Sequence, residues 1–257
     1  MGNQLAGKVV VIVGASAGIG LAASKACTAE GASVVMLARG KERLDSAAAE
    51  VGATPIICDV MHPDSVRSAF AAIAEQFGKV DALLNVAGVA RIRRIEDATD
   101  DDIAFVMGVN LLGPIYTTRA AVPLMRVAGG GDIVNVSSEI VGEYLPSMVL
   151  YGASKGGLDS FSEMMVHELK PENIRVTRYT SGSVGGTAFG DNFEMAEIEQ
   201  AYGDWMESGY LTRVAGPGME PTWMADAIVF AITRPRGQMI DVIHVRSFAP
   251  GHPELPS

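Results

Sequence analysis

Tyr151 and Lys155 form a Tyr-x-x-x-Lys pair, and Ser138 stands thirteen residues before the tyrosine. Residues four apart lie on the same face of a helix, so the ammonium group can stabilise the phenolate. A free tyrosine has a pKa of about 10 and is a poor acid or base at neutral pH, but a nearby cation lowers that pKa. The three side chains therefore suit acid–base chemistry on a hydroxyl or carbonyl group. Taken alone, such a pair usually lies on a solvated helix face, and its meaning depends on the residues before it.

A glycine-rich loop follows the first apolar segment. Residues 8–13 are mostly β-branched, as in a buried strand of a parallel sheet, and a helical apolar pattern begins at about residue 19. Between them lies Gly14-Ala15-Ser16-Ala17-Gly18-Ile19-Gly20. Strand, loop and helix in this order place backbone N–H groups where a pyrophosphate binds. We therefore predict a dinucleotide site, with a tight turn at Gly14, close backbone approach at Gly18 and helix–strand packing at Gly20. The alternative is a βα turn without a ligand.

The second predicted strand, residues 33–38, ends before Arg39. In dinucleotide-binding sheets this strand end approaches the adenosine ribose, where NAD sites commonly place an acid. Here that acid is missing, and Lys41 and Arg43 follow closely. A guanidinium suits a 2′-phosphate, so we predict NADP(H) in preference to NAD(H). The alternative is that Arg39 is only a surface cation at the start of a basic helix.

In chain order, these and further residues resemble the motifs of single-domain short-chain dehydrogenases/reductases, and the resemblance covers nearly all of the chain. Residues 14–20 resemble the family's glycine loop, with Val13 where threonine is usual. Asp59-Val60 resembles the pair that contacts adenine, and residues 85–88 resemble an Asn-Asn-Ala-Gly motif with its second asparagine replaced. Asn110 corresponds to the active-site asparagine of the long fourth helix. The tetrad is completed by Ser138, Tyr151 and Lys155.

The pattern of the chain agrees with the fold that this resemblance implies. Apolar runs alternate with helical segments, which predicts an α/β fold with a doubly wound, Rossmann-type parallel sheet and helices on both faces. No linker interrupts the pattern, so we expect residues 1–257 to form a single domain. Further strands are expected at 55–58, 81–85, 132–137, 174–180 and 239–245, and a long helix at about 101–126.

The resemblance also implies a mechanism. Tyr151 would be the general acid in carbonyl reduction and the base in alcohol oxidation, and Lys155 would lower its pKa and bind the nicotinamide ribose. Ser138 would polarise the substrate oxygen, although Ser137 competes for this role. Asn110 would hold a water that links Lys155 to solvent. The predicted cofactor contacts are Gly14, Ser16, Gly18, Ile19, Gly20, Arg39, Asp59, Val60, Asn85, Ala87, Gly88, Tyr151, Lys155, Gly182, Val184 and Thr187.

The loop after the sixth strand departs from the family pattern. A Pro-Gly pair and a threonine that touches the nicotinamide amide are usual there, but this chain has Ser181-Gly182 and places Gly186 at the threonine position. Either Thr187 takes the contact after a local shift, or the loop is unusually flexible.

Composition limits the partners. The net charge of −10 and pI near 4.9 argue against nucleic acid as a partner. No apolar run is long enough to span a membrane and no signal-peptide pattern is evident, so a cytoplasmic location is expected. Cys27 and Cys58 are expected to be buried rather than paired, and the four histidines show no metal-ligand clustering.

Residues 188–218 are expected to form a lid over the substrate site. Its aromatic residues and methionines indicate either a helix packed on the body or a large apolar pocket. Six carboxylates in this lid disfavour an acidic carrier protein or a coenzyme A thioester. The ending after His244, with prolines at 250, 253 and 256, resembles the branch that acts on small hydroxy acids and aldehydes. We therefore favour a hydrophobic, neutral alcohol or ketone as substrate.

Other functions are less well supported by the residues. A 3-oxoacyl reductase is disfavoured by the ending and by the acidic lid, and an epimerase or dehydratase would need a longer chain. A sensor or scaffold that binds NADP without catalysis usually lacks the tyrosine or the lysine, and this chain has both. By resemblance, the long fourth helix and the helix with Tyr151 should pair between subunits in a homotetramer, or failing that a dimer.

Overall fold

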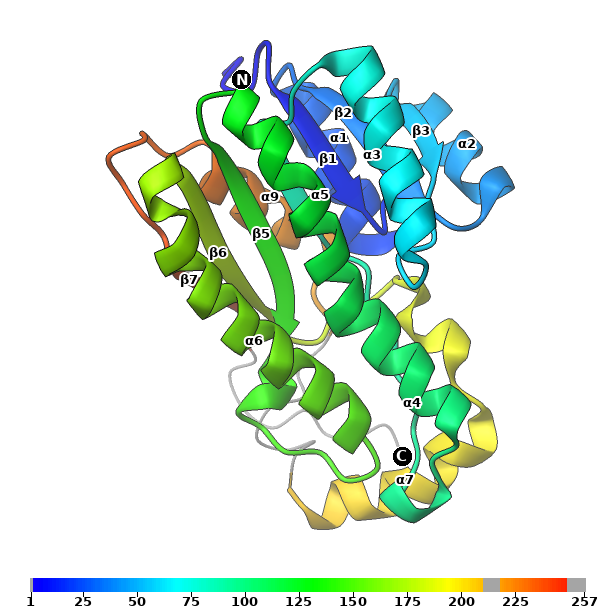
Figure 1. Cartoon of the computed structure of the whole chain (residues 1–257). Coiled ribbons are helices and arrows are strands. Elements are labelled where there is room, and N and C mark those ends of the chain that lie inside the picture. Colours follow the sequence, from blue (N-terminus) through cyan, green and yellow to red (C-terminus); the bar gives the residue numbers. More distant parts are fainter. Residues whose placement is uncertain (1, 210–217, 249–257) are drawn as a thin grey trace.

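The computed structural model describes residues 2–209 and 218–248 of the chain (Figure 1). Seven strands form one parallel sheet in the order β3-β2-β1-β4-β5-β6-β7. The direction of this order reverses between β1 and β4, and ligands of such sheets bind beyond the carboxyl ends of the strands at this point. The predicted doubly wound fold is therefore confirmed. The strands are β1 (Val9–Val13), β2 (Ser33–Ala38), β3 (Thr54–Ile57), β4 (Ala82–Asn85), β5 (Gly131–Ser138), β6 (Ile174–Ser181) and β7 (Val242–Val245).

Helices cover both faces of the sheet. One face carries α3 (Pro63–Phe77), α5 (Gly113–Val127) and α6 (Val149–Leu169), and the last two lie in front of the sheet in Figure 1. The opposite face carries α1 (Gly18–Ala29), α2 (Lys41–Val51) and α9 (Pro221–Ile232). Beyond the carboxyl edge of the sheet lie α4 (Asp100–Met107) and α7 (Met195–Glu207). The short helices are η1 (Ile95–Asp97), η3 (Glu139–Val141), η4 (Lys170–Glu172) and η5 (Ala188–Asn192).

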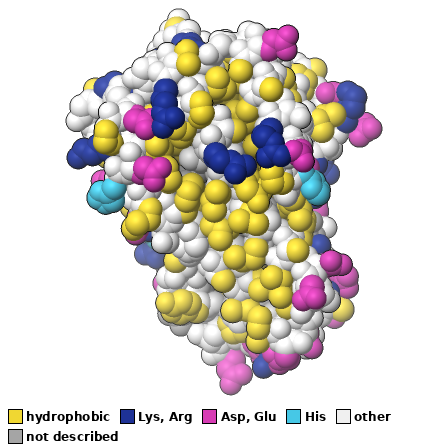
Figure 2. All heavy atoms as spheres, in the orientation of Figure 1, with side chains coloured by type: hydrophobic (Ala, Val, Ile, Leu, Met, Phe, Trp, Pro, Cys, Tyr) yellow, Lys and Arg dark blue, Asp and Glu magenta, His cyan; other side chains and the backbone are white. Residues whose placement is uncertain are grey.

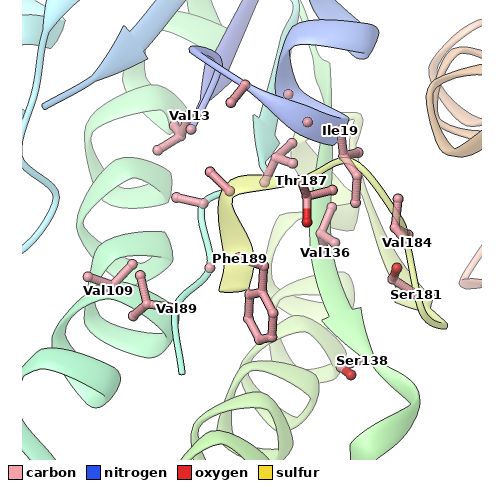
Figure 3. A pocket seen from close by; sticks show the side chains of 18 of the residues that line it. Val13, Ile19, Val89, Val109, Val136, Ser138, Ser181, Val184, Thr187 and Phe189 are labelled. Carbon is pink, nitrogen blue, oxygen red and sulfur yellow. The ribbon is translucent and has the colours of Figure 1, made fainter. Parts of the chain in front are cut away.

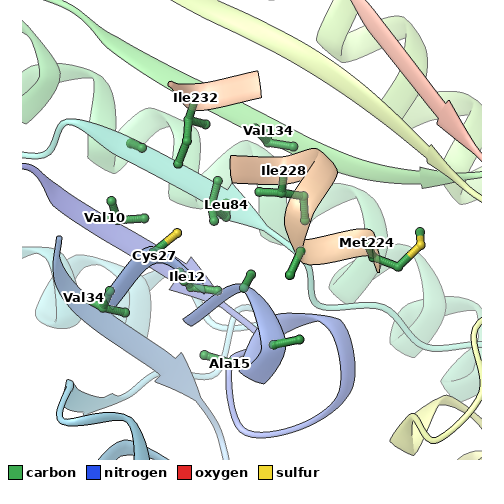
Figure 4. Close-up of a cluster of buried hydrophobic side chains, with 14 of the residues drawn as sticks. Val10, Ile12, Ala15, Cys27, Val34, Leu84, Val134, Met224, Ile228 and Ile232 are labelled. Carbon is green, nitrogen blue, oxygen red and sulfur yellow. The ribbon is translucent and has the colours of Figure 1, made fainter. Parts of the chain in front are cut away.

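A hydrophobic cluster fixes α9 and α1 to the sheet (Figure 4). Alternate strand residues, such as Ile12 and Leu84, face Ile228 of α9, and all three are fully buried. Their neighbours in sequence point to the opposite face and meet α3 and α5. Strands buried on both faces need continuous apolar sequences, which is what residues 9–13 provide. The two clusters hold the carboxyl ends of β1 and β4 rigidly at the switch point.

The bounds of several predicted elements differ in detail. The long fourth helix contains a π-helical stretch, η2 (Gly108–Leu112), between α4 and α5, and such stretches often occur at functional sites. The last strand begins at Val242 instead of residue 239, because the side chains of Arg175 and Thr177 bind the carbonyls of Gln238 and Ile240. The third strand, expected at 55–58, spans Thr54–Ile57.

Among the described residues, no helix has the length and apolar character needed to cross a membrane. Cys27 and Cys58 are buried free thiols, as expected from the sequence.

Candidate active site

A cavity of about 1170 Å³ opens at the carboxyl ends of the strands. Figure 3 shows Val13 and Ile19 at one end of it and Ser138 at the other, with Thr187 and Phe189 between them. The glycine loop and three of the four predicted catalytic residues, Ser138, Tyr151 and Lys155, therefore line one continuous space. Fourteen of the sixteen predicted cofactor contacts line the cavity, the exceptions being Asp59 and Asn85.

The glycine loop has no room for side chains at two of its glycines. Gly14 adopts a positive φ of 82°, and a Cβ there would lie 2.7 Å from the backbone of Ala87. A Cβ on Gly20 would lie 2.2 Å from the carbonyl oxygen of Gly14. These contacts bring the start of α1 and the loop after β4 against the turn, as the predicted tight turn and helix packing require. The cradle so formed fits a pyrophosphate, since Gly18, Ile19 and Gly20 at the start of α1 line the cavity and helix N-termini bind anions.

At the β2 end, the cavity is lined by Arg39 and Arg43, and also by Glu42. The Arg39 guanidinium lies 5.8 Å from the centre of the Phe105 ring, a cation–π distance that leaves its donors accessible. Val60 and Cys58 line this end, whereas Asp59 accepts a hydrogen bond from the amide of Met61. Asp59 thus organises the turn below the cavity rather than lining it.

At the opposite end, Tyr151 on the first turn of α6 faces Ser138 at the end of β5. Burial raises the pKa of Tyr151 to about 12; a hydrogen bond with Ser138 opposes this rise, and the charge of Glu139 adds to it. The ring packs on Phe189, with centroids 5.3 Å apart. The phenol is therefore protonated at neutral pH and placed to donate its proton to an oxygen atom held by Ser138.

Lys155 lies on the same face of α6 as Tyr151, with its Nζ 5.8 Å from the centre of the Tyr151 ring. Nζ donates a hydrogen bond of 2.7 Å to the carbonyl of Val136. Burial lowers the pKa of Lys155 to about 8, and the charge of Asp159 opposes that shift. Burial is the largest cause of the raised pKa of Tyr151, and the ammonium of Lys155 is held by a backbone carbonyl. That Lys155 lowers the pKa of Tyr151 stays a prediction.

Asn110 and Asn85 lie one layer below the cavity. The Asn110 amide accepts from the backbone of Val89 and donates both to the Val89 carbonyl and to Ser154 on α6. Both of its N–H donors are thereby used, so its side chain could hold the predicted relay water only through its oxygen. Asn85 donates to Asn135 and accepts from Thr117, which ties β4 to β5 and α5.

The conformation of the loop after β6 explains why glycine replaces the family's usual threonine at position 186. Gly186 adopts a positive φ of 63°, a conformation that would strain a threonine. Thr187 next to it lines the cavity, and its side chain lies against Gly18. Backbone hydrogen bonds between residues 183–185 and Met219 fix the loop. The structure thus favours the local shift over a flexible loop.

The lid matches the prediction only in part. Phe189 and Trp205 line the cavity, while Phe193 and Ile198 pack on the body beside Ile140. Tyr202 is exposed, so not all aromatic residues of the lid face the body or the cavity. Residues 210–217 and the proline-containing tail at 249–257 lie outside the described residues.

Three of the six acidic side chains of the lid lie next to arginines. Glu197 is buried and bound to Arg93. Asp204 lies 3.7 Å from Arg94, and the carboxylate of Asp191 lies 3.9 Å from Arg43. The field that a substrate meets is therefore less negative than the count of acids indicates.

Comparison with known proteins identifies the family. The sequence model described as short chain dehydrogenase matches residues 8–197. The chain belongs to the short-chain dehydrogenase/reductase family. Short-chain dehydrogenase ausX from Penicillium brasilianum is 31% identical over 235 residues, 88% of this chain and 89% of the relative. Carbonyl reductase family member 4 from Danio rerio is 34% identical over 222 residues, 80% of this chain and 93% of the relative. The chain is therefore an oxidoreductase.

A solved structure agrees. A metagenomic short-chain oxidoreductase in complex with NADP superposes with a TM-score of 0.79 at 25% identity, covering 96% of this chain and all of that one. Binding of a nicotinamide cofactor is thus supported by a family member of the same architecture.

Sequence reasoning did not predict that Glu139 and Arg43 line the cavity. Glu139 is buried in the first turn after Ser138, and its charge acts on Tyr151. Its position directly after the predicted serine was a usable signal. Arg43 follows Arg39 by four residues and lies in the first turn of α2, a position that could have indicated that it faces the same ribose end.

Proposed function

We propose that this short-chain dehydrogenase/reductase uses NADP(H) to interconvert an alcohol and a ketone or aldehyde at the Ser138 end of the cavity. One observation carries the proposal: a single cavity joins the glycine loop and Arg39 to Ser138, Tyr151 and Lys155. A cofactor bound along the loop would supply the hydride, while the protein supplies position and proton transfer.

The residues then have distinct tasks in carbonyl reduction. Ser138 binds and polarises the carbonyl oxygen. Tyr151 donates its proton to that oxygen as the carbon gains a hydride, so the product is a neutral alcohol. Lys155 stabilises the phenolate that remains until it regains a proton from solvent. In the oxidising direction the phenolate would accept the proton from the alcohol, and the raised pKa of Tyr151 makes this direction more demanding at neutral pH.

The substrate end supports a hydrophobic substrate. Its lining side chains are mainly apolar, namely Ile140, Leu145, Met148, Phe189 and Trp205. The name carbonyl reductase of one relative supports reduction of a carbonyl group. A 3-oxoacyl reductase stays the enzymatic alternative, and a sensor or scaffold that binds NADP without catalysis stays the non-enzymatic one.

Turnover of a panel of hydrophobic ketones and aldehydes, with NADPH and with NADH, tests the function. We expect NADPH-dependent reduction of at least one neutral ketone or aldehyde. Binding of NADPH without turnover of any compound, including 3-oxoacyl thioesters, would favour the sensor instead.

Arg39→Asp is expected to reverse the cofactor preference. The substitution removes a charge-assisted contact with the 2′-phosphate and adds a repulsive charge, so the ratio of kcat/KM for NADPH over NADH should fall by about 10–100-fold. Lys170→Asp makes the same change in charge at an exposed residue that does not line the cavity, and it should leave the ratio unchanged. An unaltered ratio in Arg39→Asp would refute the assigned role.

A homotetramer, or failing that a dimer, is also proposed, while the cytoplasmic location remains a prediction from the sequence. Figure 2 shows hydrophobic side chains gathered over the face on which α5 and α6 lie. Large apolar side chains exposed on α4, η2, α5 and α6 are Ile103, Leu112, Val127, Val149 and Met164. Exposed apolar area of this kind favours association. Light scattering after size exclusion should give a multiple of the 27.0 kDa chain mass; a stable monomer at micromolar concentration contradicts the proposal.

A further inference from the structure

The buried carboxylate of Asp159 lies next to the Tyr151–Lys155 pair on α6. Asp159 follows Lys155 by four residues on α6, and both are buried, with 9% and 3% of their surfaces exposed. Residues at this spacing share a helix face, so Tyr151, Lys155 and Asp159 form one row directed at β5. Asp159 does not line the cavity, although the other two residues of the row do.

Two neighbouring residues of β5 meet this row. The Val136 carbonyl accepts the hydrogen bond from Lys155 Nζ. The Ser137 hydroxyl lies close enough to the Asp159 carboxyl to lower its pKa, although Asp159 Oδ1 makes no well-formed hydrogen bond with the described protein groups. One oxygen of the buried Asp159 carboxylate, Oδ1, is therefore not neutralised by a well-formed hydrogen bond.

Charges of alternating sign lead from the active site to solvent. Arg178 of β6 places its Nη1 3.5 Å from Asp159 Oδ2 and 2.8 Å from Glu163 Oε1. The exposed fractions of the side chains rise along this series, from 12% for Asp159 to 24% for Arg178 and 61% for Glu163. Charges near solvent are screened more strongly, so Asp159 has more influence on Lys155 than Glu163 has.

The two buried charges support each other. Burial disfavours the ammonium of Lys155, and the attraction of Asp159 opposes the resulting fall in the pKa of Lys155. In return, Lys155 and Arg178 oppose the rise that burial causes in the pKa of Asp159. Two further groups lie near the row: Glu139, whose charge acts on Tyr151, and the uncharged Asn110 near Gly88. Among these described neighbours, Asp159 is the anion that acts on Lys155.

We propose that Asp159 is a positioning residue that keeps Lys155 protonated in the working pH range, acting through its charge and without touching the substrate. The inference rests on the proposed role of Lys155 in stabilising the Tyr151 phenolate. Without the carboxylate, the attraction that opposes burial is lost, and the ammonium loses its proton at lower pH.

Asp159→Asn tests this by removing the charge while keeping the shape. In the pH profile of kcat/KM for reduction, activity falls at alkaline pH as Lys155 loses its proton. The variant should move this fall by about one pH unit to lower pH, so that activity near pH 8 drops several-fold while activity near pH 6 changes little. Glu163→Gln removes an exposed carboxylate from the same series and should leave the profile unchanged. An unshifted profile in Asp159→Asn would overturn the proposal.

A direct titration separates this inference from the proposed function. The Lys155 signal of protein labelled with ¹³C at lysine Cε, identified by its absence in Lys155→Met, should titrate at lower pH in Asp159→Asn, whether or not a substrate is known. Asp159→Glu keeps the charge and should retain the wild-type midpoint; a shift equal to that of Asp159→Asn would assign the effect to packing and refute the charge mechanism. If Asp159→Asn fails to fold, Arg178→Gln carries the test: loss of this cation should raise the Lys155 midpoint, and a fall would contradict the proposal.

Discussion

Tyr151→Phe is expected to lower kcat for carbonyl reduction by about 10³-fold while NADPH binding stays nearly unchanged. The substitution removes the only atom that is placed to donate a proton to an oxygen held by Ser138 in the described cavity. A loss of this size corresponds to about 4 kcal/mol of transition-state stabilisation. The ring contact with Phe189, with centroids 5.3 Å apart, is available to phenylalanine as well. The defect should therefore appear in the chemical step and not in folding.

Single-turnover reduction with bound NADPH measures this step directly. Tyr144→Phe is the matched control, because Tyr144 is 81% exposed and does not line the cavity; it should retain wild-type turnover. A Tyr151→Phe enzyme with more than about a tenth of wild-type kcat would show that another group donates the proton.

The fold, the turn at the glycine loop and the Tyr151–Lys155 pair were predictable because local sequence determines them. The turn at Gly14 is set by a glycine with φ 82° directly after an apolar strand. Tyr151 and Lys155 share a face of α6 because of their spacing, whatever the rest of the chain does. Parallel strands then bring these two segments to the same edge of the sheet.

Contacts between distant segments could not be predicted in this way. Asn85 belongs to a predicted cofactor motif, but its amide binds Asn135, fifty residues away, and so it supports the sheet. Glu197 counted as one of six lid acids, but Arg93 pairs with it from the loop after β4. Burial also raises the pKa of Tyr151. The four-residue spacing of Tyr151 and Lys155 in the sequence does not show how many groups of the fold surround the phenol. Each of these outcomes depends on which side chains meet across the fold.

Gly14→Ala is expected to destabilise the protein by about 2–5 kcal/mol and to raise the Kd for NADPH more than about tenfold. Two costs combine here. The positive φ of 82° strains any residue with a Cβ, and that Cβ would lie 2.7 Å from the Ala87 backbone. Because backbone cannot rotate away as a side chain can, the turn and the loop after β4 must separate. That movement widens the cradle in which the pyrophosphate would bind.

Gly52→Ala separates the two costs. Gly52, after α2, has a similar φ of 74°, but a Cβ added there would meet no atom within 4 Å. It should therefore cost only the backbone strain of about 1–2 kcal/mol and leave NADPH affinity unchanged. Thermal unfolding and fluorescence titration with NADPH compare the two variants. If Gly14→Ala matched Gly52→Ala in both measurements, the close approach of Gly14 and Ala87 would have no role in shaping the cofactor site.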